Sequence, residues 1–251
     1  MNAFDLTGKC ALVTGANTGI GQAISVGLAE AGAEIIGAGR SSMDETAALV
    51  SSVGGRFMPI AVDLSDVAQA KSLIARATET VRRPDILVNN AGTIRRADAV
   101  DVTEDDWDLV LDTNLKSAFF LSTALARATL AAQGRARIIN IASLLSFQGG
   151  IRVAAYTASK SGLAGLTRLL ANEWAAKGIN VNAIAPGYVA TNNTDALRAD
   201  AERRQSILER IPAGRWAQAS DIAGAAVFLA SAASDYVHGA VVPVDGGWLG
   251  R

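Results

Sequence analysis

Short runs of apolar residues alternate along the chain with longer stretches in which apolar residues recur every three or four positions. The short runs are mostly apolar throughout, which is typical of strands covered on both faces of a sheet. They predict strands at Cys10–Val13, Glu34–Gly37, Phe57–Val62, Ile86–Val88, Arg137–Ile141, Asn180–Ala185 and Ala240–Val244. The longer stretches predict helices at Gly19–Ala31, Asp44–Ser52, Asp66–Val81, Glu104–Ala132, Tyr156–Ala176 and Asp221–Ala230. This alternation implies right-handed crossovers and a parallel sheet with helices on both sides.

The alternation runs through residues 1–251 without a repeat, a linker or a low-complexity segment, so we predict a single α/β domain. Residues 188–220 contain no predicted strand and are rich in polar and charged residues. In one α/β domain such an insertion is more often a lid or substrate loop than a second domain. We find neither a signal peptide nor a transmembrane stretch, and therefore expect a cytoplasmic protein that does not enter a membrane.

Composition narrows the possible chemistry. Half of the residues are apolar, 19% are charged and the net charge is −1, which excludes a disordered chain and makes nucleic acid an unexpected partner. With one cysteine, Cys10, and one histidine, His238, the chain has no intramolecular disulfide and no His/Cys zinc site. We expect no metal. An enzyme of this composition would depend on Tyr, Lys, Ser, carboxylates or a cofactor.

A glycine-rich turn follows the first predicted strand and leads directly into a helix. It reads Gly15-Ala16-Asn17-Thr18-Gly19-Ile20-Gly21. Glycines let the backbone approach a pyrophosphate closely, and the N-terminus of the helix offers free N–H groups and a positive potential. Taken alone, the turn fits an ordinary glycine-rich strand–helix connection as well.

Further motifs follow in order along the chain. They are Asn89-Asn90-Ala91-Gly92, Asn114, Ser143, Tyr156-x-x-x-Lys160 and Pro186-Gly187. With the glycine turn, they resemble the short-chain dehydrogenase/reductase superfamily over the whole chain. The resemblance implies a three-layer, doubly wound Rossmann fold with a seven-stranded parallel sheet. It also implies a nicotinamide dinucleotide bound by Gly15, Asn17, Thr18, Gly19, Ile20, Gly39, Arg40, Asp63, Leu64, Asn90, Ala91, Gly92, Tyr156, Lys160, Pro186, Gly187, Val189 and Thr191.

The choice between NAD and NADP is set where the second predicted strand ends. Gly39 stands where NAD binders usually place an acid for the ribose 2′-hydroxyl, and Arg40 follows with two serines. These donors suit a 2′-phosphate, so we favour NADP(H), although an arginine stacked on adenine would also permit NAD. The resemblance places Asp63 at the adenine amino group.

The motifs predict a catalytic group of Asn114, Ser143, Tyr156 and Lys160. Tyr156 and Lys160 are four residues apart and share one helix face, so the ammonium is expected to lower the pKa of the phenol. We expect Tyr156 to exchange the proton of a substrate hydroxyl and Ser143 to hydrogen-bond the substrate oxygen. The resemblance suggests that Asn114 binds a water that connects Lys160 to solvent.

Less generic segments around these motifs are Thr93–Arg96, Leu144–Arg152, Asn172–Trp174, Ala190–Thr194, Arg210–Trp216 and Asp245–Trp248. Together they resemble the 2-deoxy-D-gluconate 3-dehydrogenase (2-dehydro-3-deoxy-D-gluconate 5-dehydrogenase) branch of the superfamily, which is usually NAD-dependent. A sugar acid needs a carboxylate anchor and hydroxyl partners. The predicted substrate residues are Arg95, Ser143, Gln148, Arg152, Tyr156 and Asn192, with Arg96 as a further candidate anchor and Ser146 as a further hydroxyl partner. Any one of the arginines fits a surface or intersubunit salt bridge equally well.

Two other classes of function stay open at this point. One is a different enzyme branch, such as gluconate 5-dehydrogenase or 3-oxoacyl-carrier-protein reductase; the other is a dinucleotide-sensing regulator without turnover. The long helices at Glu104–Ala132 and Tyr156–Ala176 are more apolar than one sheet face requires, and the family is typically tetrameric through these helices, so we expect a homotetramer.

Overall fold

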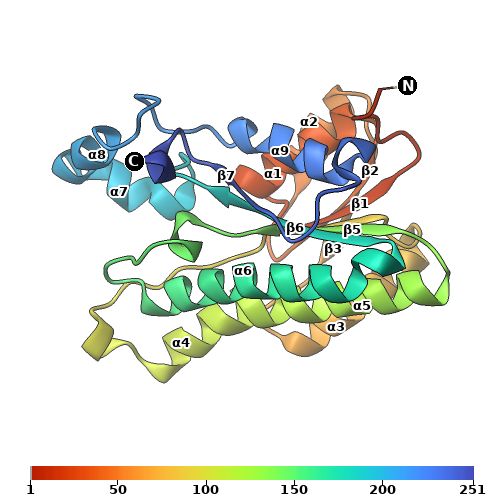
Figure 1. Cartoon of the computed structure of the whole chain (residues 1–251), viewed down its shortest axis with the longest axis horizontal. Coiled ribbons are helices and arrows are strands. Elements are labelled where there is room, and N and C mark those ends of the chain that lie inside the picture. The colour runs from red at the N-terminus through yellow and green to blue at the C-terminus, as the bar shows by residue number, and fades with distance from the viewer. Residues whose placement is uncertain (1) are drawn as a thin grey trace.

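Seven parallel strands form one sheet at the centre of the molecule, in the order β3-β2-β1-β4-β5-β6-β7 (Figure 1). The computed structural model describes residues 2–251. The strands are β1 (Cys10–Thr14), β2 (Glu34–Gly39), β3 (Phe57–Ala61), β4 (Ile86–Asn89), β5 (Ala136–Ile141), β6 (Ile179–Pro186) and β7 (Val241–Val244). Each lies within two residues of its predicted bounds. The predicted doubly wound parallel sheet is therefore confirmed.

Helices cover both faces of the sheet. On one face are α1 (Gly19–Glu30), α2 (Asp44–Ser52) and α9 (Ser220–Ala230); on the other are α3 (Val67–Thr80), α4 (Glu104–Leu111), α5 (Ser117–Ala131) and α6 (Ala154–Trp174) (Figure 1). Successive residues of β1 point to opposite faces of the sheet and belong to different cores: Leu12 packs with α3 and α5, whereas Val13 packs with α1 and α9. Two buried faces explain why the strands are apolar at every position.

The helix predicted over Glu104–Ala132 is interrupted, so the prediction of one continuous helix is wrong. A π-helical segment, Asp112–Lys116, separates α4 from α5. Asn114 lies in this wider turn with its side chain buried, and its carboxamide oxygen accepts a hydrogen bond from the backbone N–H of Thr93 at 2.8 Å. Widened turns of this kind are frequent at functional sites.

Residues 188–220 form a separate small unit beside the C-terminus of the chain (Figure 1). They contain the short helices α7 (Asp195–Ala199) and α8 (Ala201–Leu208). One isolated parallel bridge, between Val189 and Ala217, closes the base of the unit. Its apolar side chains pack with Trp248 in a small core apart from the two that flank the sheet.

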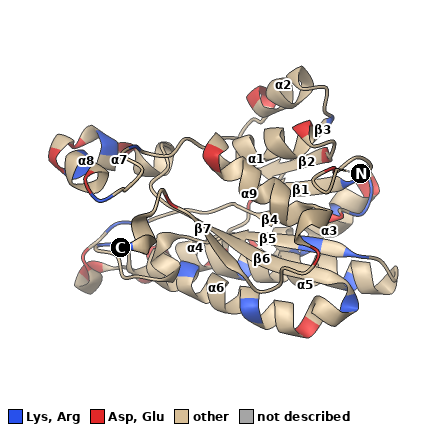
Figure 2. Cartoon of the chain, turned by 45° about the horizontal axis from the view of Figure 1, so that its top comes forward, with Lys and Arg blue, Asp and Glu red and all other residues tan. Residues whose placement is uncertain are grey.

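The surface carries both signs of charge. Acidic and basic residues are interspersed on the outer helices, for example on α8 (Figure 2). Among the residues that the structure describes, no helix is long and apolar enough to cross a membrane.

Candidate active site

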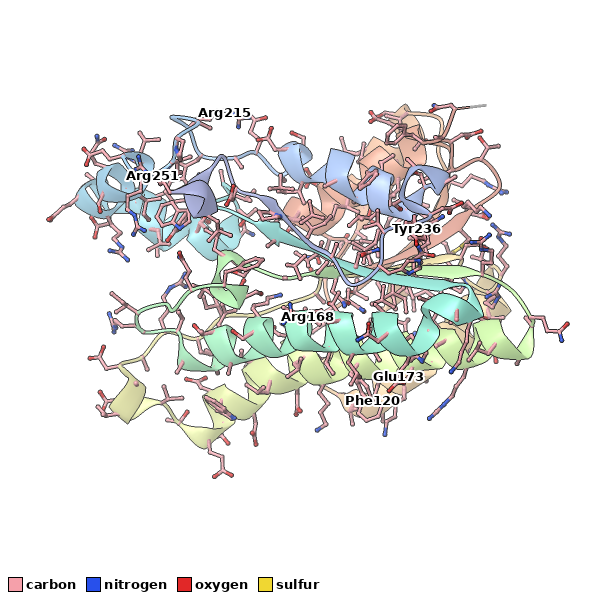
Figure 3. The ribbon with its side chains drawn as sticks, in the orientation of Figure 1. Phe120, Arg168, Glu173, Arg215, Tyr236 and Arg251 are labelled. Atoms are coloured by element: carbon pink, nitrogen blue, oxygen red, sulfur yellow. The ribbon has the colours of Figure 1, made fainter. Side chains whose placement is uncertain are left out.

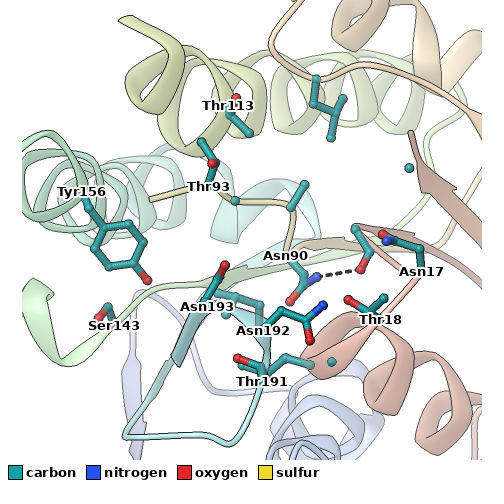
Figure 4. A pocket seen from close by; sticks show the side chains of 18 of the residues that line it. Asn17, Thr18, Asn90, Thr93, Thr113, Ser143, Tyr156, Thr191, Asn192 and Asn193 are labelled. Atoms are coloured by element: carbon teal, nitrogen blue, oxygen red, sulfur yellow. Dashed lines mark hydrogen bonds between the residues drawn. The ribbon is translucent and has the colours of Figure 1, made fainter. Parts of the chain in front are cut away.

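A cavity of about 540 Å³ opens at the carboxyl ends of the central strands. This edge is where open α/β sheets bind their ligands. Every residue predicted to bind the dinucleotide lines it, together with the substrate candidates Arg95, Ser143 and Asn192. Asn17 and Thr18 lie at one end of the cavity, and Tyr156 and Ser143 lie at the other (Figure 4).

The glycine turn between β1 and α1 forms one wall of the cavity. Gly15 and Gly19 have φ angles of +64° and +57°, a region that favours glycine. A Cβ on Gly15 would lie 2.9 Å from the carboxamide nitrogen of Asn90, which donates hydrogen bonds to the carbonyls of Thr14 and Gly15. Thr18 caps α1 without a side-chain hydrogen bond, so the N–H groups of the first turn face a site suited to a pyrophosphate.

Arg40 lies at the Asn17 end of the cavity, where β2 ends at Gly39. Its guanidinium is 3.7 Å from the Asp63 carboxylate, and its side chain is 68% exposed. A hydrogen bond from the Ser65 hydroxyl lowers the pKa of Asp63, and the Arg40 charge lowers it further. Because Gly39 supplies no carboxylate, the donors at this end suit a 2′-phosphate.

Lys160 is buried on α6, and its Nζ lies 5.6 Å from the centroid of the Tyr156 ring. The ammonium donates a hydrogen bond of 2.7 Å to the carbonyl oxygen of Ile141, at the end of β5. Burial lowers the pKa of Lys160 to about 8. The spacing of four residues therefore brings the two side chains together, as predicted from the helix period.

The pKa of Tyr156 departs from the sequence expectation. Desolvation raises it above its ordinary value, while the neighbouring Ser143 hydroxyl and the Arg96 charge act in the opposite direction. Lys160 was expected to lower it, but loss of water around the phenol outweighs the nearby charges because solvation is the main stabiliser of a phenolate.

Asn114 does not line the cavity, and its side chain instead holds two neighbouring segments together by hydrogen bonds. Its side-chain nitrogen donates to the Thr93 carbonyl at 2.9 Å and to the Ser159 hydroxyl at 3.2 Å. Thr93 lines the cavity and Ser159 precedes Lys160 on α6. The Asn114 carboxamide thus joins the turn after β4 to the helix that carries Tyr156.

Two of the six predicted substrate residues, Gln148 and Arg152, lie outside the cavity, and so do the further candidates Arg96 and Ser146. Gln148 accepts a hydrogen bond from the Trp248 indole N–H at 3.2 Å, and Arg152 forms an ion pair of 3.0 Å with Asp98. Arg95 lines the cavity, but its guanidinium is paired with Asp106 at 3.1 Å. Both arginines therefore form the salt bridges that the sequence left open as an alternative.

Several residues that line the cavity were not predicted as site residues. The polar ones include Thr93, Thr113, Asn193 and Thr194, and the apolar ones are Val62, Leu109, Ile141 and Ala142. Arg96 donates a hydrogen bond of 3.0 Å to the carbonyl of Asn193. Among residues 2–251 no group of three or more His, Cys, Asp or Glu side chains is placed to hold a metal ion.

Comparison with known proteins assigns the family. Residues 15–249 match the family model described as enoyl-(acyl carrier protein) reductase, a model of the short-chain dehydrogenases/reductases. The chain belongs to the short-chain dehydrogenase/reductase family. It is 56% identical to the 2-dehydro-3-deoxy-D-gluconate 5-dehydrogenase of Dickeya dadantii, covering 100% of this chain and 99% of the relative.

Two solved structures of this family have the same fold. One, from Agrobacterium tumefaciens, is assigned as a 2-deoxy-D-gluconate 3-dehydrogenase and contains NADP; it is 62% identical, with a TM-score of 0.96 over 100% of both chains. The other, a gluconate 5-dehydrogenase from Burkholderia cenocepacia, contains NADP and tartrate. It is 38% identical, with a TM-score of 0.93 over 100% of this chain and 98% of that one.

Proposed function

We propose that this chain is an NADP(H)-dependent dehydrogenase that interconverts a secondary alcohol and a ketone on a deoxy or keto sugar acid. One observation carries the proposal: a single cavity holds Tyr156, Lys160 and Ser143 at one end and Arg40 beside a glycine at the other. The names of the similar proteins, which act on deoxy- and dehydro-gluconates, support the substrate class.

The dinucleotide site fits NADP by the chemistry of its donors. Gly15, Gly19 and the free N–H groups of α1 would hold the pyrophosphate, and Arg40 with Ser41 would hold the 2′-phosphate. Asp63, already within 3.7 Å of Arg40, would face the adenine. The bound cofactor supplies the hydride acceptor at its nicotinamide ring.

Tyr156 moves the proton in this mechanism. In the oxidation direction its Oη accepts the proton of the substrate hydroxyl, while a hydride leaves the carbon that bears this hydroxyl. A secondary alcohol thereby becomes a ketone. Because desolvation raises the Tyr156 pKa, the phenolate needs the positive charges of Lys160 and Arg96 around it. Ser143 would hydrogen-bond the substrate oxygen and align the carbon with the nicotinamide.

Arg96 is the best candidate for the carboxylate anchor. Within the described residues, neither a salt bridge nor a carboxylate hydrogen bond occupies its guanidinium, whereas Arg95 and Arg152 are each paired with an aspartate. Arg96 does not itself line the cavity, but its charge favours the Tyr156 phenolate and its guanidinium holds the carbonyl of Asn193, which does line it. A free guanidinium can engage a carboxylate through two parallel hydrogen bonds.

The proposal extends to the lid, the assembly and the location. Thr191, Asn192, Asn193 and Thr194 line the cavity, which supports a lid in residues 188–220. Phe120 on α5 and Arg168 on α6 lie along the helices of one outer face (Figure 3), where Trp107, Leu130 and Leu169 are at least 40% exposed. Such a face suits subunit contacts in a homotetramer. A cytoplasmic location fits a nicotinamide enzyme whose one cysteine is free.

A panel of initial rates tests the function. The purified protein is assayed with 2-deoxygluconate, 2-keto-3-deoxygluconate and gluconate, each with NAD⁺ and NADP⁺, and with acetoacetyl thioesters plus NADPH. We expect the highest kcat/KM with a deoxy or keto sugar acid and NADP⁺. Turnover of thioesters alone would assign the chain to the acyl branch. Dinucleotide binding without turnover of any hydroxy or keto acid would favour a regulator.

A further inference from the structure

The C-terminal segment Asp245–Arg251 lies between the cavity wall and the lid. A Cβ on Gly187, which lines the cavity, would approach the Cα of Asp245 to 2.7 Å, and a Cβ on Gly246 would approach Ile211 to 2.9 Å. These glycines let the backbone of the segment touch both neighbours. Arg251, at the end of the chain, lies beside the lid helices (Figure 3).

Trp248 packs against the lid side. Its ring is buried, 4.8 Å from the ring of Tyr188 between centroids, and the Arg210 guanidinium lies 4.0 Å from its centroid. Ile207 and Ile211 belong to the same small core. Tyr188 stands between two cavity residues, Gly187 and Val189. The ring therefore fixes the base of the lid where the lid leaves β6.

The same ring also reaches the turn that follows β5. The indole N–H of Trp248 donates to the Gln148 side chain at 3.2 Å. Gln148 in turn donates its backbone N–H to the carbonyl of Leu144, and Leu144 packs in the core of Trp248. Leu144 directly follows Ser143, so Trp248 holds the turn that begins at a predicted catalytic residue.

We infer that Trp248 and Gln148 are a pair of positioning residues that set the geometry of the substrate end of the cavity. The two sides of this end come from separate parts of the chain, the turn after β5 and the lid after β6. Trp248 contacts both, and its hydrogen bond to Gln148 keeps the Ser143 turn at a fixed distance from the lid base. The inference rests on the proposed function, because its main readout is the KM for the sugar acid, which depends on the geometry of this end of the cavity.

The test removes the hydrogen bond; Gln148→Met does so without changing the buried Trp248 ring, whereas Trp248→Phe also reduces the volume of that ring. Trp248→Phe retains an aromatic ring without the N–H, and Gln148→Met retains chain length without the acceptor. Each should raise KM for the sugar acid about five-fold, the usual effect of losing one net hydrogen bond. The KM for NADP⁺ should stay within about two-fold of wild type. The double variant should equal Trp248→Phe, because the hydrogen bond that Gln148→Met removes is already absent there.

Trp216→Phe is the matched control. Trp216 also packs against Tyr188, with 5.4 Å between ring centroids, and its buried indole N–H has no hydrogen-bond partner among residues 2–251. The same substitution there should leave the KM for the sugar acid unchanged. An unchanged KM in Trp248→Phe overturns the inference. A rise of equal size in the Trp216 control, or an equal rise in the KM for NADP⁺, also overturns it.

Hydrogen exchange separates this inference from the proposed function. In Trp248→Phe the backbone amides of residues 146–150 should exchange faster than in wild type, and those of α3 should not change. This readout needs no substrate. If no sugar acid is turned over but the loop amides respond, the proposed function fails and the coupling stands; unchanged loop amides overturn the coupling.

Discussion

Lys160 donates a buried hydrogen bond of 2.7 Å to the carbonyl of Ile141, and burial lowers the pKa of its ammonium to about 8. The same group that is proposed to support the phenolate therefore weakens the folded state. Lowering the pKa from 10.5 to about 8 corresponds to about 3 kcal/mol. Below pH 8 this penalty is complete, and it disappears as the pH rises towards 10.5, where the unfolded chain also loses the proton.

Lys160→Met should thus gain stability and lose activity. At pH 7 the free energy of unfolding should rise by up to about 3 kcal/mol, less about 1 kcal/mol for the lost hydrogen bond to Ile141. The gain in the free energy of unfolding from removing the charge should fall to about half at pH 9.5. At pH 7 kcat should fall at least about 100-fold. Urea denaturation at the two pH values measures the first effect. Lys116→Met, at an exposed lysine, is the control; lower stability of Lys160→Met at pH 7 would contradict the prediction.

Tyr156→Phe removes the proposed proton acceptor. We expect kcat to fall by about 10²–10⁴-fold, with NADPH still bound when followed by nucleotide fluorescence. In the wild-type protein kcat/KM for oxidation should rise with pH, because the raised pKa keeps the phenol protonated at neutral pH. Tyr236→Phe, at a fully exposed tyrosine, should behave as wild type. Full activity of Tyr156→Phe would remove this residue from the mechanism.

The sequence predicted the residues whose positions depend on local geometry. Tyr156 and Lys160 are one helical turn apart, and Gly15 and Gly19 occupy a turn between a strand and a helix, so spacing predicted each pair. The resemblance to the family predicted that both pairs belong to one site, and both line the cavity. Gln148 and Arg152 were predicted to bind substrate because an amide can meet a hydroxyl and a guanidinium can engage a carboxylate. Their side chains are instead directed by Trp248, a hundred residues away, and by Asp98 on another loop.

The sequence also could not predict which arginine is neutralised by an ion pair or in which direction the pKa of Tyr156 shifts. Arg95 and Arg96 are adjacent and chemically identical, yet the Arg95 guanidinium lies 3.1 Å from the Asp106 carboxylate, whereas that of Arg96 binds only a backbone carbonyl. The pKa of Tyr156 was expected to fall, because its charged neighbours are visible in the motif. Desolvation depends on every residue packed around the phenol, and it reverses the direction.

The preference for NADP should depend on Arg40 and Gly39. Gly39→Asp places a carboxylate where a ribose 2′-hydroxyl would bind, and its Cβ would lie 3.3 Å from the Asn17 side-chain oxygen, a tight but adjustable contact. We expect the ratio of kcat/KM for NADP⁺ over NAD⁺ to fall at least about ten-fold, because a carboxylate repels a phosphate. Arg40→Ala should lower the same ratio, and Arg56→Ala, outside the cavity, should not. A wild-type ratio near one would contradict the assignment of Arg40.

Arg96→Ala distinguishes the carboxylate anchor from its neighbours. A charge-assisted hydrogen bond contributes about 1.5–3 kcal/mol, so the KM for the sugar acid should rise at least about ten-fold. Part of the loss should appear in kcat, because the Arg96 charge also favours the Tyr156 phenolate.

Arg152→Ala is the matched control, since its guanidinium is paired with Asp98 outside the cavity. A neutral analogue, such as the lactone of the same sugar acid, should bind wild type and Arg96→Ala equally well. Equal KM values for the sugar acid in Arg96→Ala and Arg152→Ala would show that Arg96 does not bind the carboxylate.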